Sequence, residues 1–214
     1  MEKKLQNIEN PYLTTEYLLS LYSDHKAARD KLKNLVRTKD LIHIKQGLYL
    51  LGEEYRRPYS KEVLSGMISG PSAISFEYAL SYHGMIPERV ETVTCICFKR
   101  DKTYSTPIGT FHYKYLAQEL YPVGLKFIQT DLGNFFIASK EKALCDLAYF
   151  QKFKDEKAAL EFIREDLRVD NSSLINLDTS LLFELGKTYQ RASTRALVDA
   201  LITLNRKDSY ASSD

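Results

Sequence analysis

The first third of the chain combines short apolar helical stripes with two short β-prone runs. Thr14 is a good N-cap for a short helix, and residues 22–24 form a polar turn after it. A second helix is predicted over residues 25–37, where apolar positions recur at the three- and four-residue spacing of one helix face. Residues 41–44 and 48–51 flank a glycine-containing turn and predict a β-hairpin.

Basic side chains occupy the face of the second predicted helix that lies opposite its apolar face. Residues 24–45 contain 7 Lys/Arg and 3 Asp/Glu, a net charge of +4, whereas the whole chain has a net charge of +2. A local basic excess in a nearly neutral chain indicates contact with a polyanion. The positions that we assign to this contact are His25, Lys26, Arg29, Lys33, Arg37, Lys45 and Gln46.

A short helix, a turn, a basic-faced helix and a hairpin are the elements of a winged helix-turn-helix in their usual order. In such a unit one helix enters the DNA major groove and the hairpin contacts the backbone. Lys26, Arg29 and Lys33 are then expected to face the groove, and Arg37 and Lys45 to contact phosphate. Two alternatives stay open: an ordinary amphipathic helix with a solvated basic face, and a winged unit that binds a protein partner.

Beyond the hairpin, the apolar pattern is interrupted between residues 52 and 60 by charged residues and a proline, which predicts a domain boundary near residue 57. Strands and helices then mix. In chain order we expect a helix over residues 76–83, strands over 90–98 and 109–116 across a charged loop at 99–104, a hairpin of 124–130 and 134–137, and a helix capped by Ser139.

Residues 154–204 show a helical pattern three times over, and these helices are expected to pack on the sheet of the second domain. Residues 209–214 should be frayed. The predicted fold class is therefore α+β. An N-terminal winged helix-turn-helix occupies residues 1–57, and a mixed α/β domain with a helical C-terminal tail occupies residues 58–208.

Three segments carry a resemblance to a known family: residues 45–49 (KQGLY), 74–88 (ISFEYALSYHGMIPE) and 137–147 (IASKEKALCDL). They look like the wing, the helix that opens the second domain and a later helix of the AbiEi family. This family comprises antitoxins and transcriptional regulators of bacterial type IV toxin–antitoxin and phage-defence loci. Many relatives have Arg immediately before the wing glycine, where this chain has Gln46.

The resemblance implies an N-terminal domain that represses its own operon by binding double-stranded DNA at inverted repeats. It also implies a second domain that opposes a nucleotidyltransferase toxin without forming a stable complex. A homodimer on the DNA is expected because operators of such proteins are usually symmetric. The second-domain motif falls on Glu77, His83, Lys140, Glu141, Lys142 and Asp146.

Motifs of known enzyme classes are absent from the sequence. We find no P-loop, dinucleotide fingerprint, nucleophile-elbow serine or H-E-x-x-H. Cys95 and Cys97 lack a second pair and are interpreted as core cysteines, so neither a metal nor a cofactor is expected. A metal-dependent phosphoryl-transfer enzyme or nuclease centred on Glu141, Lys142 and Asp146 stays open, with a plain charged helix face as the simpler interpretation.

Further features bear on location. No apolar run approaches the roughly 18 residues needed to span a bilayer, and the charged N-terminus lacks the apolar stretch of a signal peptide. Three cysteines make no disulfide framework. We therefore expect a cytoplasmic protein with no membrane contact.

His83 is interpreted as a residue that ends a helix, where the helix dipole favours it, with a general base as the alternative.

Overall fold

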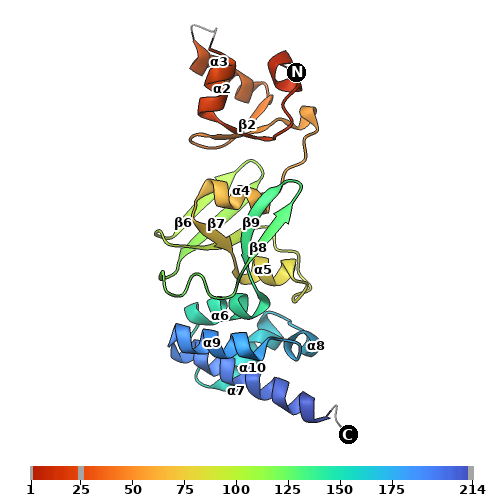
Figure 1. The fold of residues 1–214 in the computed structure, drawn as a ribbon, viewed down its shortest axis with the longest axis vertical. Helices are drawn as coiled ribbons and strands as arrows, with labels where there is room; N and C mark the ends of the chain where they lie inside the picture. The colour runs from red at the N-terminus through yellow and green to blue at the C-terminus, as the bar shows by residue number, and fades with distance from the viewer. Residues whose placement is uncertain (1, 24–26, 212–214) are drawn as a thin grey trace.

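The structure is a computed structural model that describes residues 2–23 and 27–211, with side chains described as far as residue 206. Its elements form three tiers (Figure 1): a small N-terminal unit, a six-stranded sheet with its covering helices, and a group of C-terminal helices. Within the described residues no helix is long and apolar enough to cross a membrane. The overall class is mixed α+β, as predicted.

The N-terminal unit combines three helices with an antiparallel sheet in the order β1-β3-β2. Thr14 caps α2 as predicted, because its hydroxyl accepts from the Tyr17 amide at 3.2 Å. Leu32 and Leu35 of α3 are buried in one apolar cluster with Leu18 of α2 and Leu41 of β2. The bounds of the elements are α1 (Lys3–Gln6), β1 (Tyr12–Thr14), α2 (Thr15–Leu21), α3 (Ala28–Arg37), β2 (Leu41–Lys45), β3 (Leu48–Leu51) and the 3-10 turn η1 (Glu53–Tyr55).

The sheet of the second unit has the strand order β6-β7-β5-β4-β9-β8. The β5–β7 and β4–β9 pairs are parallel, and the other pairs are antiparallel. The loop predicted at residues 99–104 is wrong, because β6 begins there and forms a hairpin with β7. The strands are β4 (Ser72–Ile74), β5 (Val93–Cys97), β6 (Lys102–Thr106), β7 (Gly109–Tyr115), β8 (Leu125–Thr130) and β9 (Gly133–Ala138).

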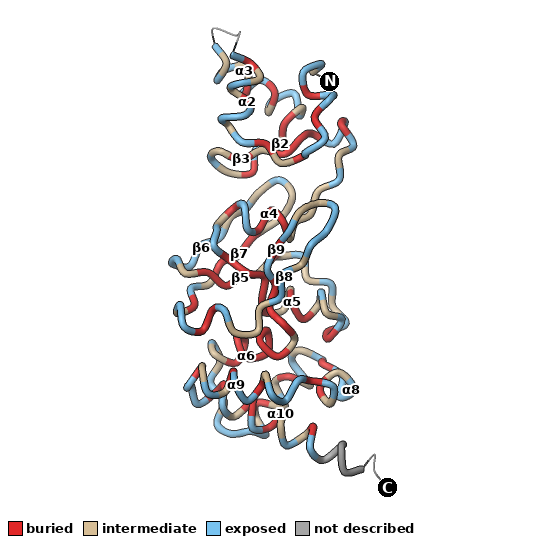
Figure 2. The backbone as a smooth tube through the Cα atoms, viewed as in Figure 1, coloured by how far each residue is buried: buried red, intermediate tan, exposed pale blue. Residues whose placement is uncertain are grey.

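Helices cover both faces of this sheet. On one face, the Tyr113 hydroxyl of β7 donates to the Ser65 carbonyl of α4 (Lys61–Ile68) at 2.7 Å. On the other lie α5 (Phe76–Tyr82) and α6 (Lys140–Phe150), and buried chain runs from the sheet into α6 (Figure 2). Cys95 and Cys97 are buried and free, as predicted, and burial raises the pKa of the Cys95 thiol to about 12.

The prediction that the C-terminal helices pack on the sheet is wrong. Helices α9 and α10 pack against α6, which lies between them and the sheet (Figure 1). The apolar stripes of the tail match this helix-on-helix arrangement equally well, so their pattern did not identify the partner. The final helix continues through Ala211, into the segment predicted to be frayed. The elements are α7 (Glu156–Glu161), the π-helical turn η2 (Phe162–Asp166), α8 (Asn171–Leu174), α9 (Thr179–Tyr189) and α10 (Ala192–Ala211).

The N-terminal hairpin connects the first two tiers. Ile44, Leu48 and Leu50 belong to the same buried apolar cluster as Leu64 of α4. The Tyr12 hydroxyl also accepts from the Ser60 amide at 2.8 Å, across the predicted boundary. The hairpin therefore lies between α2 and α3 on one side and α4 on the other (Figure 1).

Candidate nucleic-acid interface

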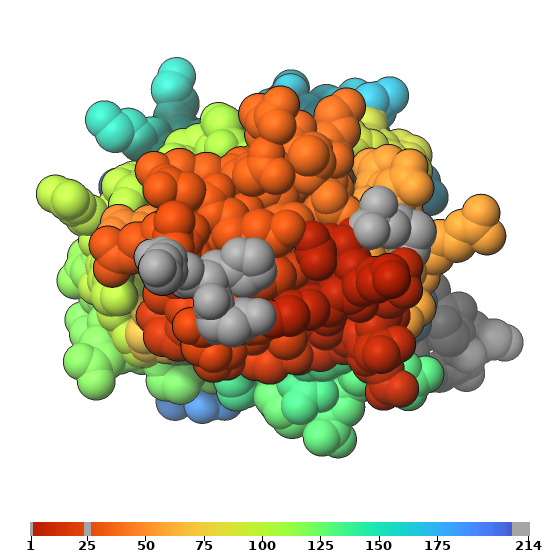
Figure 3. Space-filling view, turned by 90° about the horizontal axis from the view of Figure 1, so that it is seen from above, coloured from red at the N-terminus to blue at the C-terminus, as the bar shows by residue number. Residues whose placement is uncertain are grey.

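An exposed basic stripe runs along α3. Arg29, Lys33 and Arg37 are spaced four residues apart, so they share one helix face, and all three are exposed as predicted. At 1.5 Å per residue the stripe spans about 12 Å, comparable to the ~12 Å width of the DNA major groove. This end of the molecule is the one viewed in Figure 3. His25 and Lys26, predicted for the same face, lie outside the described residues.

The stripe is held by weak contacts on the surface. Lys33 Nζ donates to Asp30 Oδ1 at 2.9 Å, and this hydrogen bond and the lysine charge hold the pKa of Asp30 below its usual range. Arg37 donates to Asn34 Oδ1 at 2.7 Å from Nη2 and at 3.3 Å from Nε. Exposed pairs of this kind contribute little, so both cations can reorient toward a phosphate at small cost.

Two other lysines of the N-terminal unit, Lys4 and Lys31, make internal contacts, whereas Lys3 and Lys39 are exposed. Lys31 Nζ donates to Glu2 Oε2 at 2.5 Å and lies 5.7 Å from the centre of the Tyr22 ring. Lys4 Nζ donates to the Leu21 carbonyl at 3.0 Å. The basic stripe on α3 therefore remains available to an external polyanion, and exposed Lys39 directly follows that helix.

The lysine at the tip of the hairpin contacts the second unit. Lys45 Nζ donates to the carbonyl of Ile68 at 2.7 Å and is half-buried, so the phosphate contact expected of it would require this hydrogen bond to break. The cause is the packing of Ile44 and Leu48 on the second unit, which carries the lysine toward the end of α4. Gln46 is exposed in the turn, as predicted.

For Lys45→Ala we expect the free energy of unfolding to fall by about 1–2 kcal/mol, because a hydrogen bond from a charged donor is lost. Its effect on DNA binding should be small. The measurement is urea unfolding together with a salt series of DNA affinity. A salt slope shallower by about 1 would instead mean that Lys45 contacts a phosphate in the complex.

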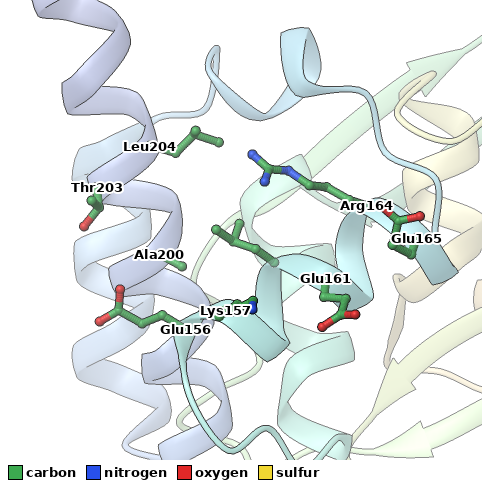
Figure 4. Close-up of a pocket in the computed structure, with 9 residues that line it drawn as sticks. Glu156, Lys157, Glu161, Arg164, Glu165, Ala200, Thr203 and Leu204 are labelled. Carbon is green, nitrogen blue, oxygen red and sulfur yellow. The ribbon is translucent and has the colours of Figure 1, made fainter.

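A groove of about 780 Å³ lies at the opposite end of the molecule, between α7, η2 and α10 (Figure 4). Three of its lining residues are glutamates, Glu156, Glu161 and Glu165, against the two cations Lys157 and Arg164. This excess of carboxylates disfavours a polyanion. The two ends of the molecule thus differ in the charge of their exposed side chains, and the basic stripe on α3 is the better candidate for binding nucleic acid.

Two residues of the second-domain motif, Lys142 and Asp146, belong to a buried polar network. Lys142 and Asp146 have 0% exposed side chains, and Lys142 Nζ lies 3.2 Å from Asp146 Oδ1. The same ammonium donates to the Leu120 carbonyl at 3.0 Å and to the Tyr189 hydroxyl at 2.8 Å. The Ser75 hydroxyl donates to Asp146 Oδ2 at 2.5 Å, which connects the two motif segments of the second unit. The interpretation of Lys142 as part of a charged helix face is wrong.

All three protons of the Lys142 ammonium are used within the network. The Tyr189 hydroxyl donates to Asp146 in turn, and burial together with the Asp146 charge raises the pKa of Tyr189 well above its usual range. The tyrosine thus remains a proton donor. A closed set of partnered groups of this kind joins α6, α9 and the segment before α5, and it leaves no acid or base in contact with solvent.

The other motif residues have separate surroundings. Glu141 is also buried, which the charged-face interpretation missed, and its Oε1 accepts from the Asp178 amide at 3.0 Å, just before α9. His83 ends α5 as predicted, with Nε2 2.8 Å from the Ala138 carbonyl of β9. Lys140 and Glu77 are half-buried, and Glu77 lines a small cavity. The structure therefore does not bring the six motif residues into one site.

Sequence reasoning did not find Tyr189. It lies 43 residues from Asp146 in a helix whose pattern is generic, so no local signal marks it. Ser75 lies inside the motif segment of residues 74–88, next to a residue with a left-handed backbone, Phe76 at φ +58°. A polar residue directly before a helix is usually interpreted as a cap, but the Ser75 side chain makes no cap bond and reaches Asp146 instead.

A pH dependence follows from His83. Burial is the main cause that lowers its pKa in the folded state. As the pH falls below about 6.5, the unfolded chain therefore binds a proton at His83 that the folded chain does not bind. Protonation then favours the unfolded state, and the free energy of unfolding decreases. We expect His83→Gln to lose less stability than the unmodified chain between pH 7.5 and 5.5 in urea unfolding. An equal loss in both proteins would contradict this.

Comparison with known proteins shows that the fold of this chain is similar to one that has been solved. No family model matches the chain, and no curated protein sequence matches it. Among solved structures, it is similar to the crystal structure of the Rv2827c protein from Mycobacterium tuberculosis, with a TM-score of 0.51 and 13% sequence identity. The similarity covers 94% of this chain and 79% of that one. At this identity it shows a shared fold and carries no statement about activity.

Proposed function

We propose that the protein is a sequence-specific, double-stranded DNA-binding transcriptional repressor. Its recognition element is α3, the second helix of an N-terminal winged helix-turn-helix. The observation that carries the proposal is the exposed stripe of Arg29, Lys33 and Arg37 on a short helix. The preceding α2 and the following β2–β3 hairpin, with the sheet order β1-β3-β2, support it.

The three cations take different roles along the groove. Arg29 is nearest the start of α3, the end that reaches base edges in helix-turn-helix proteins, and its guanidinium suits the O6 and N7 acceptors of guanine. Lys33 supplies a mobile charge. Arg37 is oriented by Asn34 and retains N–H donors for a phosphate.

We further propose that the protein regulates its own operon as a homodimer on inverted repeats and opposes a nucleotidyltransferase toxin. This rests on the resemblance of residues 74–88 and 137–147 to the AbiEi family. The hydrogen bond between Ser75 and Asp146 supports it, because it joins these two segments in one unit. Lys142 and Asp146 then act as the internal frame of that unit.

Fluorescence anisotropy tests DNA binding, using the full chain, its own upstream DNA and a scrambled duplex of equal composition. We expect binding to the upstream DNA to be at least ~10³-fold tighter at physiological salt. Its affinity should also fall steeply between about 50 and 200 mM salt. Equally weak, salt-insensitive binding to both duplexes would overturn the proposal and favour a winged unit that binds protein.

The antitoxin role is tested separately by co-expressing the chain with the toxin that the proposal requires, a nucleotidyltransferase encoded in the same operon. The full chain should restore growth. A variant with Arg29→Ala, Lys33→Ala and Arg37→Ala should restore it too when expressed from an unrelated promoter, because the second unit is unchanged. Failure of the unmodified chain to restore growth would remove the antitoxin role and leave the repressor proposal intact.

A further inference from the structure

A small cavity of about 180 Å³ lies between α5, the end of α6 and the parallel strands β5 and β7. A cavity of about 150 Å³ can hold benzene, so this one has room for a small molecule and not for a polymer segment. It is far from α3, in the second unit. Three apolar residues, Phe76, Leu147 and Phe150, and three polar ones, Glu77, His112 and Lys114, contribute to its lining.

Opposite charges line this cavity without neutralising each other. Among the residues that the structure describes, the Glu77 side chain has no ion-pair or hydrogen-bond partner, and neither has the His112 side chain. Lys114 Nζ lies 4.6 Å from the centre of the Phe150 ring and forms no ion pair with Glu77. The aromatic face stabilises the ammonium there. A carboxylate and an ammonium thus border one small space and stay apart.

The aromatic wall is rigidly placed. Phe76 has φ +58°, a backbone conformation that costs a bulky residue about 1–3 kcal/mol and that occurs preferentially at ligand sites. Its neighbour Ser75 holds it there: the Ser75 amide donates to the Thr94 carbonyl at 3.0 Å, and the Thr94 hydroxyl donates to the Ser75 carbonyl at 2.9 Å. The Phe76 ring lies 5.8 Å from that of Phe150.

The register of β5 and β7 places the polar residues on the same side of the sheet. Thr94 pairs with His112, and Lys114 follows two residues later on β7, so both β7 side chains face α5 and α6. Glu77 reaches the cavity from α5. The carboxylate and the cation therefore come from different elements, with the apolar wall of Phe76 and Phe150 beside them.

We propose that this cavity binds a free α-amino acid with a small apolar side chain, such as valine or leucine. The ligand ammonium pairs with Glu77, and its carboxylate pairs with Lys114 and accepts from His112. Its side chain packs against Phe76 and Phe150. A zwitterion satisfies both unpaired charges at once, whereas a ligand with a single charge leaves one of them unpaired in a partly enclosed site. The site does not depend on DNA binding.

Isothermal titration calorimetry of the full chain with L-valine and L-leucine tests the proposal. We expect saturable binding of at least one of them, with a Kd between about 1 μM and 1 mM. Leucinamide lacks the carboxylate and N-acetyl-leucine lacks the ammonium, so each should bind at least ~10-fold more weakly than leucine. A tenfold loss corresponds to about 1.4 kcal/mol.

Glu77→Gln and Lys114→Met should each weaken binding at least ~10-fold. Glu184→Gln and Lys126→Met change exposed residues of the same types elsewhere and should leave it unchanged. If Glu77→Gln proves unstable, Glu77→Asp replaces it in the test, because aspartate keeps the carboxylate charge. Glu77→Asp should then retain more affinity for the amino acid than Glu77→Ala. Any one of three results would overturn the proposal: no saturable binding of either amino acid at about 10 mM, full affinity for N-acetyl-leucine, or full affinity in a folded Glu77→Gln variant.

Discussion

Asp146→Ala is expected to lower the free energy of unfolding by about 3–5 kcal/mol, because it leaves a buried ammonium without its counter-ion. Lys142 would keep only the Leu120 carbonyl and the Tyr189 hydroxyl as acceptors. Ser75 and Tyr189 would lose the carboxylate to which both donate. Urea denaturation followed by circular dichroism measures the change.

Glu184→Ala is the matched control for this experiment, because Glu184 is an exposed carboxylate on α9, and it should cost little. A second variant, Lys142→Met with Asp146→Leu, removes both charges together and should recover much of the lost stability. A loss below about 1 kcal/mol for Asp146→Ala would mean that the network contributes little to the fold.

The second large effect concerns DNA. A variant with Arg29→Ala, Lys33→Ala and Arg37→Ala should bind the upstream duplex roughly 100-fold more weakly at physiological salt. Each phosphate contact contributes about 0.9 to the logarithmic salt slope, so the slope should become shallower by about 3 if all three cations contact phosphate. If Arg29 reads bases instead, the slope should change by about 2, and specificity for the upstream duplex should also fall. Anisotropy over a salt series measures both quantities.

The control keeps the change in net charge the same. Lys152→Ala, Lys154→Ala and Lys157→Ala remove three exposed cations from the region that follows α6. This variant should retain the affinity and salt slope of the unmodified chain. If both triple variants lose affinity equally, binding depends on net charge and α3 is not the DNA-reading element.

Local patterns predicted the elements of the N-terminal unit well. Thr14 capped α2, and the two β-prone runs formed the hairpin. Strand β1 was missed because it has three residues and begins directly after a proline, too short for an alternation to show. The position of Lys45 was also missed, because it depends on which surface the hairpin packs against. No periodicity within the hairpin carries that information.

In the second unit, too, local patterns predicted the elements but not the contacts between them. Ser139 capped α6 as predicted, and β8 and β9 formed the expected hairpin. The burial of Lys142 could not be predicted, since a lysine and an aspartate four residues apart on a helix are usually a surface pair. Only the tertiary structure, which brings Tyr189 and Leu120 to them, distinguishes an internal pair from a solvated one.

The buried network also sets an order for events during protein synthesis. Its groups come from Ser75, Leu120, Lys142, Asp146 and Tyr189, so they span more than half of the chain. While a ribosome is still translating α9, Lys142 and Asp146 have already emerged but lack the tyrosine whose hydroxyl bonds to both of them in the finished protein. The sheet and α6 therefore complete their packing only after nearly all of the chain has been made, whereas the N-terminal unit has its whole core as soon as residue 55 has emerged.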